Sequence, residues 1–198
     1  PGEGDPGRHI GLGEHGHSVF FRNLNRGKKS VSLNLKSAAG REALLRIAAT
    51  VDVFVEAFRP GVAARLGFDY EAVRQRNPRI IYVSWTAFGQ TGPYRDVPAH
   101  NLACEALAGT VSVNVGADGQ PAMPHVPVSD FAAASMGLAG VLMALYRREK
   151  TGAGMFWCRS GGKFYVKCVW NNAERAGLQP GMEVLEVHTF RVTRNEDL

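Results

Sequence analysis

The sequence predicts an α/β fold, in which helices cover both faces of a doubly wound, mainly parallel sheet. Two apolar runs, residues 51–58 and 79–85, have the length of strands and are rich in β-branched and aromatic side chains. Segments with apolar residues at helical spacing lie before, between and after them. Strands that are apolar on both faces are typical of parallel sheets buried between helices. This alternation therefore indicates an α/β domain.

The expected elements follow one another along the chain with recognisable boundaries. Residues 30–35, "SVSLNL", alternate as a half-buried strand does, and residues 37–50 have helical spacing. Asp69 is expected to cap a short helix that ends before Pro78. A Gly- and Pro-rich loop, residues 86–100, directly follows the second apolar strand. Ligands bind at this carboxyl edge in folds of this class.

The longest predicted helix begins at Asp130 and ends near Arg148. Small residues recur along it at spacings of four, three and four and form a stripe that allows close backbone packing. They are Ala133, Gly137, Gly140 and Ala144. We interpret the stripe as core architecture. Because Ala and Gly dilute the apolar character of the run, we expect a buried helix of a soluble protein rather than a membrane span.

The composition of the chain excludes some classes of protein function. The 198 residues are 45% hydrophobic and carry a formal charge of +5, with 23 Lys and Arg against 18 Asp and Glu. The basic residues are scattered, apart from a short cluster near Arg26, which argues against a nucleic-acid partner. Three cysteines without a C-x-x-C pair predict reduced thiols in the cytoplasm. No secretory pattern is visible, and a start in mid-loop without Met predicts an incomplete fold.

Three short motifs do not indicate a functional site. "GLGEHG", residues 11–16, matches G-x-G-x-x-G, but no strand precedes it, so we expect a flexible loop. His15 and His17 lack a third metal ligand of matching character, and no metal is predicted. His100 and Cys104 lie one helical turn apart, yet no third group is available to orient them as a nucleophilic pair.

Four segments together resemble, in order and spacing, the family III CoA-transferases, the family that also contains α-methylacyl-CoA racemases and formyl-CoA transferase. The segments are residues 25–36, 53–70, 77–96 and 126–154. The likeness runs from about residue 4 to residue 154. It implies a Rossmann-like large domain, here residues 1–154 and incomplete, from an interlocked homodimeric enzyme of the cytoplasm.

The resemblance implies covalent chemistry at Asp130. In the family, a carboxylate at this position attacks an acyl-CoA thioester, and CoA then moves to a carboxylic acid through an aspartyl-CoA intermediate. A carboxylate suits this role because it need not lose a proton first. From the helix pattern alone, Asp130 is an N-cap, a task that Ser129 could share. The family register favours the nucleophile.

The resemblance also assigns residues to CoA, which is expected as a substrate, and to the acyl site. They are Asn25, Arg26, Lys28, Lys29, Phe58, Arg59, Arg65, Gly89 and Gln90. The first four lie in a segment that lines the nucleotide end of CoA in the family, where phosphates make cations useful. A solvated turn before a strand is the alternative for that segment. Ala57 stands where the family usually has Asn.

One departure from the family separates two activities. Racemases carry a Gly-His-Asp stretch whose Asp moves the α-proton, and the matching residues here are Ala99, His100 and Asn101. An amide cannot act as a general base near pH 7. A racemase-like protein is therefore the second interpretation, and a CoA-transferase the first. His100 remains a candidate catalytic acid or base.

Residues 155–198 are predicted to be a C-terminal extension. Met155 stands where the family has Gln, and the likeness ends there. Residues 164–187 resemble the middle of a PDZ domain, around the turn "AGLQPGMEVLEV". A third interpretation is thus an inactive fragment or chimera, whose tail binds peptides by adding a strand to a sheet edge.

Overall fold

The computed structural model describes residues 4–14, 17–123, 126–160, 163–166 and 183–184. The chain divides into two compact parts, Pro1–Leu44 and Leu45–Leu198. The predicted sheet and most of the predicted site residues lie in the second part.

A buried serine organises the start of the first part. The Ser18 hydroxyl donates to the carbonyl oxygen of Gly7 (2.6 Å) and accepts from the N–H of Phe21 (3.0 Å), which caps a short helix. The elements here are η1 (Pro6–His9), the antiparallel strands β1 (Gly13–Glu14) and β2 (His17–Ser18), and α1 (Val19–Leu24). Helix α2 (Ala38–Ala48) runs across the division between the two parts.

The strand predicted at residues 30–35 does not form. The segment has neither helical nor strand structure, and Val31 is 63% exposed. None of the described strands pairs with it. Alternation produces a strand only where a neighbour completes the hydrogen-bonded ladder, so the prediction from alternation alone was wrong.

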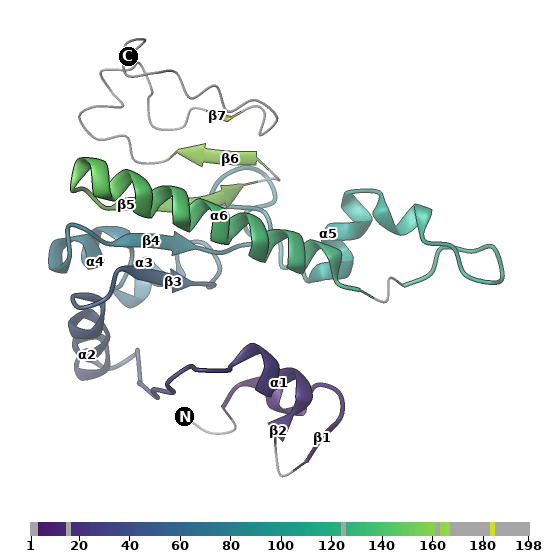
Figure 1. Cartoon of the computed structure of the whole chain (residues 1–198), viewed down its shortest axis with the longest axis horizontal. Coiled ribbons are helices and arrows are strands. Elements are labelled where there is room, and N and C mark those ends of the chain that lie inside the picture. The colour runs from purple at the N-terminus through teal and green to yellow at the C-terminus, as the bar shows by residue number, and fades with distance from the viewer. Residues whose placement is uncertain (1–3, 15–16, 124–125, 161–162, 167–182, 185–198) are drawn as a thin grey trace. The chain divides into compact units, whose positions relative to one another are not determined.

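The second part is built on a five-stranded sheet in the order β3-β4-β5-β6-β7 (Figure 1). Three strands are parallel: β3 (Val53–Glu56), β4 (Ile81–Ser84) and β5 (Met155–Ser160). Two more join antiparallel at one edge: β6 (Lys163–Val166) and β7 (Glu183–Val184). Both predicted apolar strands are confirmed, and so is the α/β class with its parallel sheet.

Helix α6 (Val128–Thr151) covers one face of this sheet (Figure 1). Ile81 and Val83 of β4 pack with Met155 and Ala144 in the core beneath it. Close approach depends on Gly137 of the predicted stripe, because a Cβ added there would overlap the indole of Trp85, 1.9 Å from Cη2.

The opposite face of β4 meets an aromatic cluster. Tyr82 points away from α6, as the period of two along a strand requires, and its ring contacts Tyr70 and Phe156. Its hydroxyl donates to the carbonyl oxygen of Phe68 (3.1 Å). Helices α3 (Val62–Leu66) and α4 (Tyr70–Arg76) lie on this face of the sheet, opposite α6. Asp69 caps α4 by accepting from the N–H of Ala72 (3.1 Å), as predicted.

The expectation that α6 is buried was wrong for most of its surface. One face packs on the sheet, and it ends in Arg148, whose guanidinium donates to Asp52 (2.8 Å). The opposite face leaves apolar side chains more than half exposed: Phe131, Leu138, Leu142 and Tyr146. Helix α6 has 24 residues, and an 18-residue stretch of it has a mean hydropathy of 1.6, which is the length and composition of a membrane span; 17% of that stretch is buried. Hydrophobic spacing identifies a helix, but it does not reveal what covers each face.

Strand β5 continues the parallel sheet beyond residue 154. The PDZ-like segment, residues 164–187, lies for the most part outside the described residues.

Candidate functional site

A cleft of about 390 Å³ opens where β3 and β4 end. Its walls are residues 57–60, which follow β3, and residues 85–88, which follow β4. The loop at 95–100 and the starts of two helices, α5 (Asn101–Leu107) and α6, complete the lining. The cleft thus lies at the carboxyl edge of the parallel strands, where folds of this class bind ligands.

Asp130 lines this cleft from the first turn of α6. Its side chain is exposed, and within the described segments it makes no hydrogen bond or ion pair. The positive end of the helix dipole favours a negative charge at this place, by about 0.3–1 kcal/mol. The alternative interpretation of Asp130 as the N-cap is wrong, because the N-cap is Pro127.

Other predicted site residues gather around Asp130. His100 lines the cleft as the N-cap residue of α5, and Phe58 and Arg59 line it from the loop after β3. Cys104, which lies one helical turn after His100 in the sequence, borders the same cleft. The four side chains that lie with Asp130 come from segments as far as 72 residues (130 − 58) from it in the sequence, and the fold brings them together.

A buried polar network joins the two loops that form the walls of the cleft. Glu56, at the end of β3, accepts from the N–H of Phe58 (2.8 Å) and from the hydroxyl of Ser84. Gln90 donates to the same Ser84 hydroxyl (2.6 Å). Gly89 has a φ of 84°, a left-handed conformation that favours glycine, and so sets the turn that brings Gln90 back to β4. Gln90 and Arg59 also border a second cavity of about 390 Å³.

Besides Gly89 and Gln90, five predicted site residues are absent from the lining of the cleft. Arg65 is exposed in the last turn of α3. The other four, Asn25, Arg26, Lys28 and Lys29, belong to the first part of the chain. There, Lys28 donates to the amide oxygen of Asn25 (3.1 Å), and all three cations are exposed. Because the two parts are separate bodies, the cleft in the second part is defined without these residues.

Sequence reasoning missed three residues of this region. Arg95 lines the cleft and adds a second guanidinium to that of Arg59. Asn101 and Glu105 make hydrogen bonds to the first turn of α6. Their spacing of four puts both on one face of α5, but it does not indicate which segment that face contacts. Asn101 is an amide and cannot act as a general base near pH 7, and its amide oxygen accepts from Ser129.

Among the described residues, no group of three or more His, Cys, Asp and Glu side chains is arranged to hold a metal ion. The ionisable groups of the cleft are instead two arginines, one histidine, one cysteine and one carboxylate. Such a set fits an anionic ligand held beside a carboxylate nucleophile.

Comparisons with known proteins place the chain in a family. The model of the family described as CoA-transferase family III matches residues 1–157. The acetyl-CoA:oxalate CoA-transferase of Acetobacter aceti is 41% identical over 155 residues, 78% of this chain and 40% of that protein. The succinyl-CoA:glutarate CoA-transferase of Homo sapiens is 34% identical over 157 residues, 79% of this chain and 36% of that protein.

Solved structures show the same relationship. Rv3272 from Mycobacterium tuberculosis superposes with a TM-score of 0.71 and 35% identity over 79% of this chain and 44% of that one. A CaiB/BaiF family protein from Brucella suis gives a TM-score of 0.71 and 30% identity over 80% and 43%. The chain therefore spans less than half the length of these relatives. With the family match covering most of its residues, the chain belongs to CoA-transferase family III.

Proposed function

We propose that this chain is part of an enzyme that moves CoA between an acyl-CoA thioester and a carboxylic acid, with Asp130 as the covalent nucleophile. An oxygen of Asp130 attacks the thioester carbonyl carbon, the C–S bond breaks, and CoA leaves as a thiolate. An acyl-aspartyl anhydride remains. The thiolate then attacks the aspartyl carbonyl carbon, which releases the donor acid as a carboxylate and gives an aspartyl-CoA thioester.

The acceptor acid reverses these two steps. Its carboxylate attacks the aspartyl thioester and expels the CoA thiolate, and the thiolate then attacks the acceptor carbonyl carbon of the new anhydride. Asp130 leaves as a free carboxylate, and the acceptor leaves as its CoA thioester. Each step exchanges one anionic nucleophile for another, so the cycle balances without net proton transfer.

The observation that carries the proposal is the free carboxylate of Asp130, which lines the cleft at the start of α6. His100 lies in the same cleft and is proposed to hydrogen-bond the oxygen that develops charge in each tetrahedral intermediate.

We further propose a dicarboxylic acid as the acceptor. The relatives are named for oxalate and for glutarate, which are both dicarboxylic acids. In this chain, Arg59 and Arg95 line the cleft that holds Asp130. Guanidinium groups bind carboxylates through two parallel hydrogen bonds, so one arginine can hold the second carboxylate while the first one reacts.

The other expectations from the sequence remain proposals. The first part of the chain, with Arg26, Lys28 and Lys29, and the exposed Arg65 are proposed to hold the CoA phosphates. Residues 155–198 are proposed to be an extension of the 1–154 domain. An interlocked homodimer in the cytoplasm is proposed for the complete enzyme, and sedimentation of that enzyme tests the dimer.

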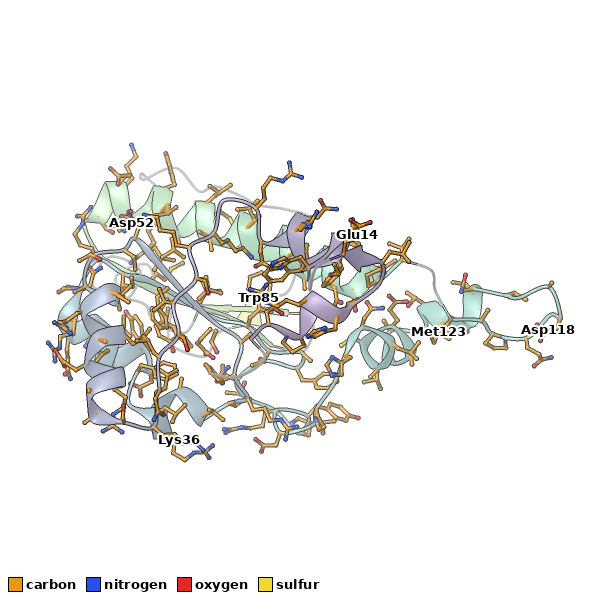
Figure 2. All side chains as sticks on the ribbon, turned by 90° about the horizontal axis from the view of Figure 1, so that it is seen from below. Glu14, Lys36, Asp52, Trp85, Asp118 and Met123 are labelled. Atoms are coloured by element: carbon orange, nitrogen blue, oxygen red, sulfur yellow. The ribbon has the colours of Figure 1, made fainter. Side chains whose placement is uncertain are left out.

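Hydroxylamine trapping tests the nucleophile. The purified chain is incubated with an acyl-CoA and hydroxylamine, which converts an aspartyl anhydride or thioester to a hydroxamate, and peptides are then analysed by mass spectrometry. We expect a hydroxamate on Asp130. Asp130→Asn should abolish it, whereas Asp118→Asn, at a loop tip that lies well away from Trp85 of the cleft (both labelled in Figure 2), should not. A hydroxamate on another carboxylate, or none in folded protein, contradicts the proposal.

A further inference from the structure

At the start of α6, the side chain of the N-cap residue accepts no hydrogen bond from the backbone N–H groups of the first turn. The first N–H groups of any helix have no partner inside the helix. Pro127, the N-cap residue, makes no side-chain hydrogen bond to them. Partners for Val128 and Ser129 come instead from α5, 23 and 28 residues earlier in the chain.

Two side chains of α5 make these contacts. Glu105 is 2% exposed, and its Oε1 accepts from the N–H of Val128 (2.9 Å), which also faces the carbonyl oxygen of Val126 (2.9 Å). The amide oxygen of Asn101 accepts from the N–H of Ser129 (3.1 Å) and from its hydroxyl (2.5 Å). The start of α6 is therefore fixed by a buried carboxylate and an amide, side by side on one face of α5.

Asp130 is left without a capping task. It is the third residue of α6, and a carboxylate at that position can accept from the N–H of the N-cap residue. Here the N-cap residue is Pro127, which has no N–H. The local sequence thus denies Asp130 its usual partner, while α5 satisfies the neighbouring donors.

We propose that Asn101 and Glu105 are positioning residues for Asp130. They keep the first turn of α6 helical and leave the Asp130 carboxylate free to face the cleft. A misplacement of about 1 Å in a reacting group can lower a rate by about 100-fold. The catalytic consequence rests on the proposed role of Asp130 as nucleophile. Asn101, which cannot serve as a racemase base, has a function as a hydrogen-bond acceptor.

The test compares variants that remove or keep an acceptor oxygen. Glu105→Met and Asn101→Leu remove it at similar side-chain size, whereas Glu105→Gln keeps it. Asp69→Ala is the matched control, because it removes a carboxylate that caps a different helix, α4, and that lies outside the cleft.

Three quantities are measured on the full chain. Hydrogen exchange reports the protection of the amides of Val128 and Ser129. The rate of hydroxamate formation at Asp130 reports reactivity with acyl-CoA. The rate at which a water-soluble carbodiimide couples an amine to Asp130, relative to Asp118 in the same sample, reports the environment of the carboxylate without any need for substrate.

We expect Glu105→Met to speed exchange at the start of α6 and to slow hydroxamate formation at Asp130, each by about tenfold or more. The concentration of acyl-CoA that gives half the maximal rate should stay within about twofold. Glu105→Gln should recover most of the lost rate, and Asp69→Ala should leave all these quantities unchanged. Faster exchange with an unchanged rate at Asp130 would overturn the inference.

Failure of the proposed function gives a different result. If the unmodified chain forms no hydroxamate, the nucleophile assignment fails and the carbodiimide ratio decides the inference. A change of about threefold or more in that ratio, in Glu105→Met and Asn101→Leu but not in Asp69→Ala, supports positioning. An unchanged ratio overturns it.

Discussion

Replacing Gly137 with Ala inserts a methyl group where α6 rests on Trp85, the aromatic wall of the cleft (labelled in Figure 2). The added Cβ would lie 1.9 Å from Cη2 of the indole and 2.5 Å from Cζ3. Ordinary van der Waals contact begins at 3.4 Å, so the ring or the helix has to move by 1.5 Å (3.4 − 1.9). A wall of the proposed acyl-CoA site therefore shifts.

The expected change in stability is the difference between two opposing effects. Overpacking a core destabilises it by about 1–3 kcal/mol, and Ala in place of Gly stabilises a helix interior by about 1 kcal/mol. The net loss is about 0–2 kcal/mol, which lowers the melting temperature of a chain of this size by up to about 8 °C. Acyl-CoA binding should weaken as well, because Trp85 lines the cleft.

Thermal unfolding followed by circular dichroism measures the first effect. Ala139→Gly, on the exposed face of the same helix, isolates the helix-propensity contribution without touching Trp85. If Gly137→Ala raises the melting temperature as much as Ala139→Gly lowers it, then no steric conflict exists, and the packing of α6 on Trp85 is refuted.

Two further predictions concern groups outside the cleft. Arg148→Met should lower the free energy of unfolding by about 1–3 kcal/mol in urea, whereas Asp52→Asn should lower it by less than about 1 kcal/mol, because Arg148 is 9% and Asp52 78% exposed. Equal losses would contradict this asymmetry. Burial, with the charges of Glu56 and Asp69, raises the pKa of Tyr82 well above its usual range. An unfolded tyrosine ionises near pH 10, so the free energy of unfolding should fall as pH rises above about 10. In Tyr82→Phe the free energy of unfolding should decrease less over the same pH range. An unchanged pH dependence would show that the decrease does not come from Tyr82.

Local signals account for the elements that the sequence predicted well. The apolar runs that became β3 and β4 are too hydrophobic for the surface, and Asp69 satisfies donors only three residues away. Residues 30–35 had an equally regular pattern, but a strand also requires a partner, and the pattern contains no information about one. The exposed apolar face of α6 shows the same limit, since the spacing of Phe131, Leu138 and Leu142 fits a helix whatever covers it.

The family likeness located Asp130, His100, Phe58 and Arg59, which the fold then gathers around one cleft. Contacts between α5 and α6 could not be found in this way. Glu105 meets a donor 23 residues away, and such a pairing depends on the path of the loop between the two helices. No periodicity or motif within either helix encodes that path.

Position 101 has Asn where racemases of the family have Asp. The two side chains have to be compared for each chemical role that the position can have. A carboxylate at this position offers both a base and an oxygen acceptor, and an amide retains only the acceptor. The acceptor is the function that α6 uses here, since Ser129 donates to it and Pro127 cannot take part in a capping box. Loss of the base disfavours racemase chemistry, which needs a proton acceptor. The proposed transferase cycle needs none, because each of its steps exchanges one anion for another.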